Sequence, residues 1–147
     1  MAAANDQPEK QVIMIVDDSP ESIALISGLL NDLYRVKVAT NGKDALRIAF
    51  SSDPLDLVLL DIMMPGMDGY EVCSHLKGDS QTSDIPVIFL TAKSDDADEE
   101  KGFELGAVDY ITKPISPSIL LARIRTHLRL KRVTEYLKDK LEAADLL

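Results

Sequence analysis

Five polar side chains that could carry out chemistry each follow a short apolar run in this 147-residue chain. They are three acids, a hydroxyl and an amine: Asp17, Asp18, Asp61, Thr91 and Lys113. Neighbouring carboxylates repel one another unless they are protonated, solvated or bridged by a cation. Carboxylate oxygens with open water positions suit Mg²⁺, and a hydroxyl with an ammonium suits the oxygens of a transferred phosphoryl group. If the fold brings these residues together, we expect phosphoryl chemistry at Asp61.

Each of these residues also has a plainer explanation. Asp17 and Asp18 could simply cap a helix, Asp61 could form a turn, Thr91 could be an ordinary strand residue, and Lys113 could be a solvated charge. The joint pattern, with all five at the ends of four different apolar runs, favours a site.

The elements that must position these residues are read from hydrophobic periodicity. Apolar or alternating runs predict five strands, at residues 11–16, 34–39, 55–60, 86–91 and 108–111. Helical spacing predicts five helices. The first begins at Ser19-Pro20-Glu21, and its apolar residues at helical spacing are Ile23, Ile26, Leu29, Leu30 and Leu33. The others are expected around residues 45–50, at 69–77, at about 95–105, and from 116 to the end. The run at 34–39 alternates, which indicates an edge strand.

This alternation of strands and helices predicts an α/β fold. Unbroken apolar strands are buried on both faces, so the sheet should be parallel, doubly wound and flanked by helices. Ligands bind such sheets beyond the carboxyl ends of the strands, and the five polar residues are expected at that edge.

Bulk properties exclude several classes of function. The net charge of −9 disfavours binding to nucleic acid or anionic membranes. Cys73 is the only cysteine, which excludes an intrachain disulfide or a cysteine metal cluster. Residues 1–10 have neither the basic start nor the apolar centre of a signal peptide, and no apolar run reaches the length of a membrane span. We expect a cytoplasmic protein with a disordered tail at residues 1–10.

Four motifs together resemble the receiver domain of bacterial two-component response regulators. These motifs are Asp17-Asp18, Asp61 with the loop at 63–69, Thr91-Ala92, and Lys113-Pro114. The resemblance covers roughly residues 11–130 and implies a flavodoxin-like sheet with strand order 2-1-3-4-5. The predicted organisation is a tail at 1–10, a receiver domain at 11–130 and an extended helical, coiled-coil linker at 131–147.

The resemblance also implies roles for individual residues. Asp61 would accept a phosphoryl group from the phosphohistidine of a sensor histidine kinase or phosphotransfer protein. Mg²⁺ would be held by Asp18, Asp61 and the backbone carbonyl of Met63, with Asp17 acting largely through water. The phosphoryl oxygens would contact Lys113, Thr91 and Ala92. Thr91 and Tyr110 would be the switch residues, and the Lys113-Pro114 bond would be cis.

Two further positions should flank the phosphoryl group. Met63 and Lys93 each lie two residues after a key position, Asp61 and Thr91 respectively. The Met63 side chain cannot orient an attacking water, so we expect a long-lived aspartyl phosphate.

The last helix is longer than a receiver domain needs. Ile119, Leu120, Ile124 and Leu128 are expected to pack on the sheet. Beyond them, Leu130, Leu137 and Ala144 keep a seven-residue spacing, which predicts a short coiled-coil seam; the alternative is an overhang that frays.

Opposite charges on the last two helices predict a homodimer. The last helix is basic and the one before it acidic, through Arg123, Arg125, Arg129, Lys131 and Arg132 against Asp95, Asp96, Asp98, Glu99 and Glu100. The dimer would use helix four, strand five and helix five together with the C-terminal helix; the alternative is that both charged faces are merely solvated. The long last helix also resembles receivers joined to cyclic-di-GMP enzymes.

Other functions remain open at this stage. One is an aspartate-nucleophile phosphatase of the haloacid dehalogenase type, which would need an acid where this chain has Met63. Another is an interaction domain that works without phosphorylation. The preferred interpretation is a phosphoacceptor module that phosphorylates and dephosphorylates only itself, and is not an enzyme acting on an external metabolite.

Overall fold

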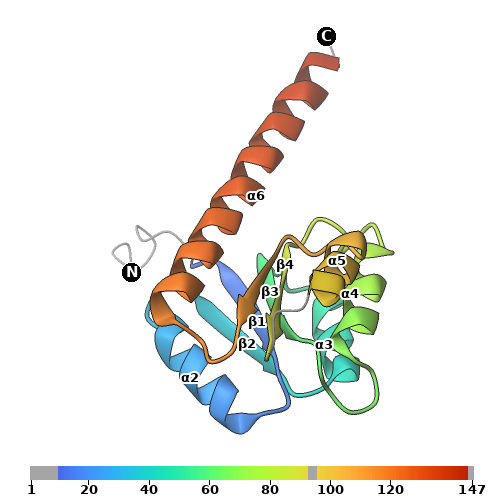
Figure 1. The fold of residues 1–147 in the computed structure, drawn as a ribbon. Helices are drawn as coiled ribbons and strands as arrows, with labels where there is room; N and C mark the ends of the chain where they lie inside the picture. Colours follow the sequence, from blue (N-terminus) through green and yellow to red (C-terminus); the bar gives the residue numbers. More distant parts are fainter. Residues whose placement is uncertain (1–9, 93–95, 146–147) are drawn as a thin grey trace.

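Strands and helices alternate along the chain in the computed structural model, which describes residues 10–92 and 96–145 (Figure 1). The strands are β1 (Val12–Val16), β2 (Arg35–Ala39), β3 (Leu57–Asp61), β4 (Val87–Thr91) and β5 (Asp109–Thr112). The helices are α2 (Pro20–Leu30), α3 (Gly42–Ala49), α4 (Gly69–Lys77), α5 (Asp96–Glu104) and α6 (Pro117–Asp145). All neighbouring strands are parallel, in the order β2-β1-β3-β4-β5. The predicted fold class and strand order are confirmed.

Some sequence predictions concern parts of the chain that lie outside this description. The predicted disorder of the tail concerns residues 1–10, of which only Lys10 is described. The predicted position of Lys93 beside the phosphoryl group also lies outside the described residues, as do the predicted ion pairs of the Asp95, Asp96 and Asp98 side chains.

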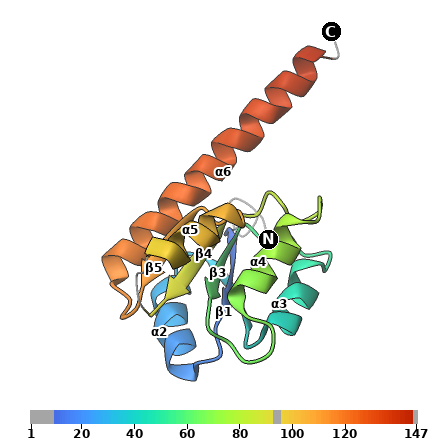
Figure 2. The same cartoon turned by 45° about the vertical axis from the view of Figure 1, so that its right-hand side comes forward.

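The helices cover the sheet in two layers, with α2 and α6 on one face and α3, α4 and α5 on the other (Figure 2). Strand β1 shows why: its residues alternate between the two faces. Ile15 packs in the same cluster as Ile26 of α2 and Ile124 of α6. Met14 packs with Val72 of α4 in the other cluster. Because both faces are covered, every residue of β1, β3 and β4 is buried.

Local capping sets where several helices begin or end. Ser19 caps α2 by accepting the backbone N–H of Ser22 at 3.3 Å, and Pro20 occupies the first helical position. Asp68 caps α4 by accepting the N–H of Glu71 at 2.9 Å. Gly106, predicted to end α5, has a φ of 107°, a left-handed conformation that glycine adopts without steric cost.

Two apolar residues were placed wrongly by periodicity. Leu33 was assigned to the first helix, but α2 ends at Leu30 and Leu33 is 54% exposed. Ile119 was expected to pack on the sheet and is 45% exposed, whereas Leu120, one position along, is fully buried. Each helix buries only one stripe, so periodicity alone mislabels positions at its margin.

Helix α6 runs unbroken from Pro117 to Asp145 and projects beyond the sheet (Figure 1). Leu130, Leu137 and Leu141 on this helix are all more than half exposed. The predicted division at residue 130 and the coiled-coil linker stay predictions. Among the described residues, no helix combines the length and apolar character needed to cross a membrane.

Candidate functional site

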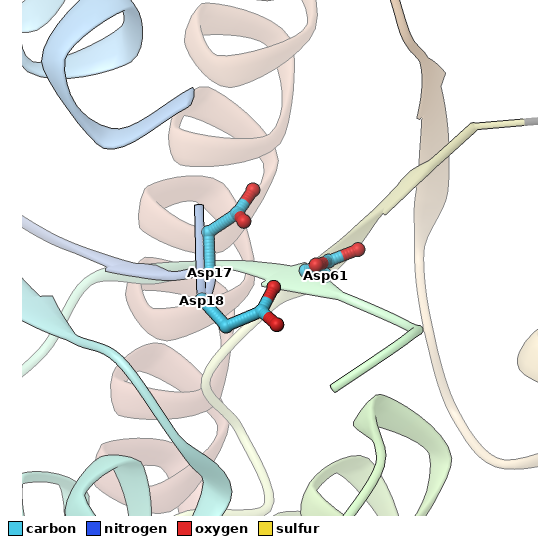
Figure 3. A group of neighbouring side chains, drawn as sticks. All are labelled: Asp17, Asp18 and Asp61. Atoms are coloured by element: carbon cyan, nitrogen blue, oxygen red, sulfur yellow. The ribbon is translucent and has the colours of Figure 1, made fainter. Parts of the chain in front are cut away.

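Three carboxylates gather where β1 and β3 end (Figure 3). Asp17 and Asp18 follow β1 directly, and Asp61 is the last residue of β3. One oxygen from each lies within 4.8 Å of the others. Asp17 is fully buried and Asp61 nearly so, whereas Asp18 is exposed. Parallel pairing places Val16 beside Leu60, which brings the two strand ends level.

Lys113 supplies positive charge beside these acids. Its Nζ lies 2.8 Å from Oδ2 of Asp17 and 3.7 Å from Oδ1 of Asp61. The other oxygen of Asp17, Oδ1, accepts the backbone N–H of Ser19 at 2.9 Å. Both oxygens of Asp17 therefore have partners within the chain. The sequence prediction gave Lys113 only to the phosphoryl group and did not foresee its contact with Asp17.

Burial and negative charge together make Asp61 a weaker acid than usual. Burial is the largest cause, followed by the charge of Asp17, and they raise the pKa of Asp61 from 3.8 to about 6. Lys113 lowers that pKa, Asp18 raises it, and the backbone N–H of Met63 lowers it by hydrogen-bonding the carboxylate. The ionised cluster is therefore under electrostatic strain that a cation would relieve.

The carboxylate cluster fits a magnesium ion. Oxygens on one Mg²⁺ lie about 2.1 Å from the ion and hence at most about 4.2 Å apart. The oxygens of Asp17, Asp18 and Asp61 all lie within 4.8 Å of one another, so two of them can bind one ion directly while the third acts through water. Asp18 is exposed, so water can complete the octahedral coordination that Mg²⁺ prefers.

A pocket opens beside Asp61 at the carboxyl end of the sheet. Its wall is formed by Asp61, Ile62, Met63, Leu90, Thr91, Ala92 and Lys113. Thr91 is the last residue of β4 and is 8% exposed, whereas the Met63 side chain is 78% exposed. The structure therefore brings all the predicted phosphate-contacting residues to one pocket, although their roles stay predictions.

Tyr110, in β5, is buried. Its hydroxyl donates to the backbone carbonyl of Glu99 at 2.7 Å, and its ring centroid is 5.1 Å from that of Phe103. The hydroxyl fills the space where a Cβ on Gly102 would lie, since that atom would be 1.9 Å away. Gly102 was given no role from the sequence. A glycine within a helix is unfavourable, and that was the available signal of a close approach.

Gly69 packs directly against the backbone that carries Asp61. Its N–H donates to the carbonyl of Ile62 at 2.8 Å. A Cβ at Gly69 would lie 2.3 Å from the carbonyl oxygen of Asp61 and 2.8 Å from Cα of Ile62. Only glycine allows the first turn of α4 to approach the end of β3 this closely.

The start of α6 is tied to β5 within the same chain. Arg123 donates to the carbonyl of Tyr110, and its Nε lies 3.9 Å from Oδ2 of Asp109. Nε2 of His127 lies 2.8 Å from the same oxygen. The Lys113-Pro114 peptide bond that precedes α6 is cis, as the resemblance implied. Arg123, proposed from the sequence for an intersubunit ion pair, therefore has intrachain partners.

Comparison with known proteins gives a consistent result. Residues 13–125 match the family described as response regulator receiver domain. A Vibrio cholerae protein named "Probable cyclic di-GMP phosphodiesterase" is 54% identical over 128 residues, which are 87% of this chain and 29% of that protein. "Response regulator PleD" of Caulobacter vibrioides is 42% identical over 129 residues, which are 87% of this chain and 28% of that protein. The chain thus spans less than a third of the length of these two relatives.

Solved structures give the same fold. The BeF3-activated receiver domain of DrrB, a Thermotoga maritima response regulator, superposes with a TM-score of 0.73 at 40% identity, covering 82% of this chain and 98% of that one. The chemotaxis protein CheY4 of Vibrio cholerae gives a TM-score of 0.76 at 29% identity, covering 80% and 98%.

Proposed function

The chain belongs to the response regulator receiver domain family, and on that premise we propose that Asp61 accepts a phosphoryl group from a phosphohistidine. The donor would be a sensor histidine kinase or a phosphotransfer protein. The observation that carries this proposal is the placement of the Asp61 carboxylate beside Asp17 and Asp18, with Nζ of Lys113 3.7 Å away.

In the proposed transfer, an oxygen of Asp61 attacks phosphorus in line with the phosphorus–nitrogen bond of the donor. The new phosphorus–oxygen bond forms as the phosphorus–nitrogen bond breaks, and the leaving imidazole takes up a proton. Lys113 would turn from Asp17 to the phosphoryl oxygens, and the Thr91 hydroxyl and the Ala92 backbone would hydrogen-bond them. These groups line the same pocket as Asp61.

The residues that would hold Mg²⁺ are Asp18, Asp61 and the backbone carbonyl of Met63. Asp17 would act through water, a role supported by its oxygens, which already accept from Ser19 and Lys113. When bound, the ion would neutralise charge that develops on the phosphoryl oxygens.

We further propose that this receiver works in cyclic-di-GMP signalling, with self-phosphorylation and autodephosphorylation as its only chemistry. The support is the naming of the Vibrio cholerae relative as a probable cyclic-di-GMP phosphodiesterase. Any such activity would belong to another part of a longer protein.

We also propose a homodimer as the signalling form, with Thr91 and Tyr110 linking phosphorylation to the dimer surface. The surface would comprise α5, β5 and α6, including the exposed side chains Phe103, Leu130 and Leu137. Exposed ion pairs across such a surface contribute about 0–1 kcal/mol each, so they would set register more than affinity.

Acetyl phosphate tests the phosphoacceptor role. With Mg²⁺ present, the protein is expected to gain the mass of one phosphoryl group, and Asp61→Ala is expected to gain none. The control is Asp32→Ala, because Asp32 is an exposed acid away from the site and its loss should leave the adduct intact. Intact-mass spectrometry measures the result. No adduct on the parent, or an undiminished adduct on Asp61→Ala, would refute the proposal.

Met63 is expected to lengthen the lifetime of the aspartyl phosphate. Its exposed side chain lies at the pocket but offers no group to orient water. The aspartyl phosphate of Met63→Asn should therefore hydrolyse faster, because an amide can position the attacking water. The decay of the adduct after removal of acetyl phosphate measures this, with Met63→Leu as an apolar control of similar size. Equal lifetimes for the Asn variant and the parent would contradict the assignment.

A further inference from the structure

The second half of α6 passes the amino ends of the strands without a buried apolar side chain among its described residues. The buried apolar residues of α6 are Leu120, Ile124 and Leu128, and no described residue after Leu128 in this helix is buried. A cavity of about 300 Å³, bordered by Pro86, Val108, Leu130 and Thr134 among others, lies between the helix and the segment before β4. Close packing therefore does not hold this part of the helix.

One ion pair anchors the helix at Lys131. Its Nζ lies 3.6 Å from Oδ1 of Asp56 and 2.6 Å from Oε1 of Glu135 on the same helix, and the side chains of Lys131 and Asp56 are 16% and 26% exposed. The other oxygen of Asp56 accepts the backbone N–H of Val12 at 2.7 Å. Asp56 is thus fixed at the amino ends of β1 and β3, and Lys131 ties α6 to the start of these two strands.

A second ion pair lies two turns further along α6. Nζ of Lys138 is 3.3 Å from Oδ2 of Asp84, the two side chains are 55% and 76% exposed, and both residues border the cavity. Residues seven apart on a helix point within about 20° of each other, so Lys131 and Lys138 lie on one face. Leu130 and Leu137 lie about 100° away and remain exposed.

We propose that the pairs Asp56–Lys131 and Asp84–Lys138 form a strap that fixes the direction and rotation of α6 on the receiver body. Two attachments seven residues apart hold both the tilt of a rod and its rotation about its own axis. The strap thereby presents the exposed apolar stripe of Leu130 and Leu137 on one defined side. The strap does not require phosphorylation of Asp61, so an experiment can refute the strap without refuting the proposed function, and the reverse.

Pulsed electron–electron resonance can measure the direction of α6. Nitroxides at introduced Lys43→Cys and Ala143→Cys report the distance from the exposed start of α3 to the end of α6. The otherwise unchanged chain should give a narrow distribution. Lys131→Met combined with Lys138→Met should broaden it, because the loss of each pair removes a preference of up to about fivefold for the attached orientation.

The matched control combines Arg129→Met with Arg132→Met. These exposed cations lie on the same helix, so the loss of charge and the gain of methionine are equal. The control distribution should stay narrow. A charge exchange gives the rescue: Asp84→Lys or Lys138→Asp alone should broaden the distribution, and the two together should narrow it again. An unchanged width in the Lys131 and Lys138 double variant, or equal broadening in the arginine control, would overturn the strap.

Discussion

Asp61→Asn is expected to stabilise the metal-free protein at pH 7 by about 1–3 kcal/mol in the free energy of unfolding. The reason is the environment of this carboxyl group, since burial and the charge of Asp17 raise its pKa from 3.8 to about 6. At pH 7 the folded chain therefore holds Asp61 as a carboxylate in surroundings that favour its protonated, neutral form. An uncharged amide of the same shape removes this cost.

The pH dependence gives the sign of the effect. Between about pH 4 and pH 6 the folded state binds the Asp61 proton more tightly than the unfolded state does, so the stability of the parent falls as the pH rises. Below pH 4 the group is protonated in both states and the penalty vanishes. The gain from Asp61→Asn should therefore be small near pH 4 and should reach its full size above pH 6.

Urea unfolding in EDTA at several pH values measures this gain. Added Mg²⁺ should reduce the difference in unfolding free energy between Asp61→Asn and the parent. The ion binds the folded parent and stabilises it by mass action, whereas the variant lacks one ligand. Asp32→Asn, which removes an exposed acid, should change the stability little at any pH. Identical pH profiles for the parent and Asp61→Asn in EDTA would show that the carboxylates do not oppose folding.

Gly69→Ala is expected to destabilise the protein by about 1–3 kcal/mol, the usual cost of overpacking. The added Cβ would lie 2.3 Å from the carbonyl oxygen of Asp61. That contact is with backbone, which cannot move aside as a side chain can. The end of β3 or the start of α4 must shift, so the acetyl phosphate adduct on Asp61 should also decrease.

Gly28→Ala provides a control of opposite sign. Gly28 lies within α2, and nothing stands within 4 Å of a Cβ added there. Alanine is favoured over glycine inside a helix by about 1 kcal/mol, so this variant should be more stable than the parent and should keep its phosphoryl adduct. Equal unfolding free energies for Gly69→Ala and the parent would mean that the backbone around Asp61 is more adaptable than its packing indicates.

The fold was predictable because its elements are locally marked. Strand β3 is a continuous apolar run that ends on Asp61, and Ser19-Pro20 marks the start of α2 before helical spacing begins. Errors arose where a pattern has no sharp end. Ile119 and Leu120 are adjacent and equally apolar, and only the angle at which α6 meets the sheet decides which of them is buried.

The meeting of these residues at one edge of the sheet was predictable, but the contacts among them were not. The residues lie at or just after the ends of four strands, and parallel strands bring their carboxyl ends to one edge. The 2.8 Å contact between Lys113 and Asp17 joins residues 96 positions apart and depends on how β5 sits beside β4. The approach of Gly102 to Tyr110 likewise depends on the placement of α5 over β5, which no spacing in the sequence encodes.

The two edge strands of the sheet, β2 and β5, affect how readily the protein aggregates at high concentration. Unpaired strand borders can recruit strands from other molecules and seed fibrils. β2 carries the cationic residues Arg35 and Lys37, and charge on a border strand disfavours such recruitment. At the other border, β5 has four residues, and the Arg123 guanidinium donates a hydrogen bond to the carbonyl oxygen of Tyr110. We therefore expect Arg123 to hinder intermolecular strand addition at this border.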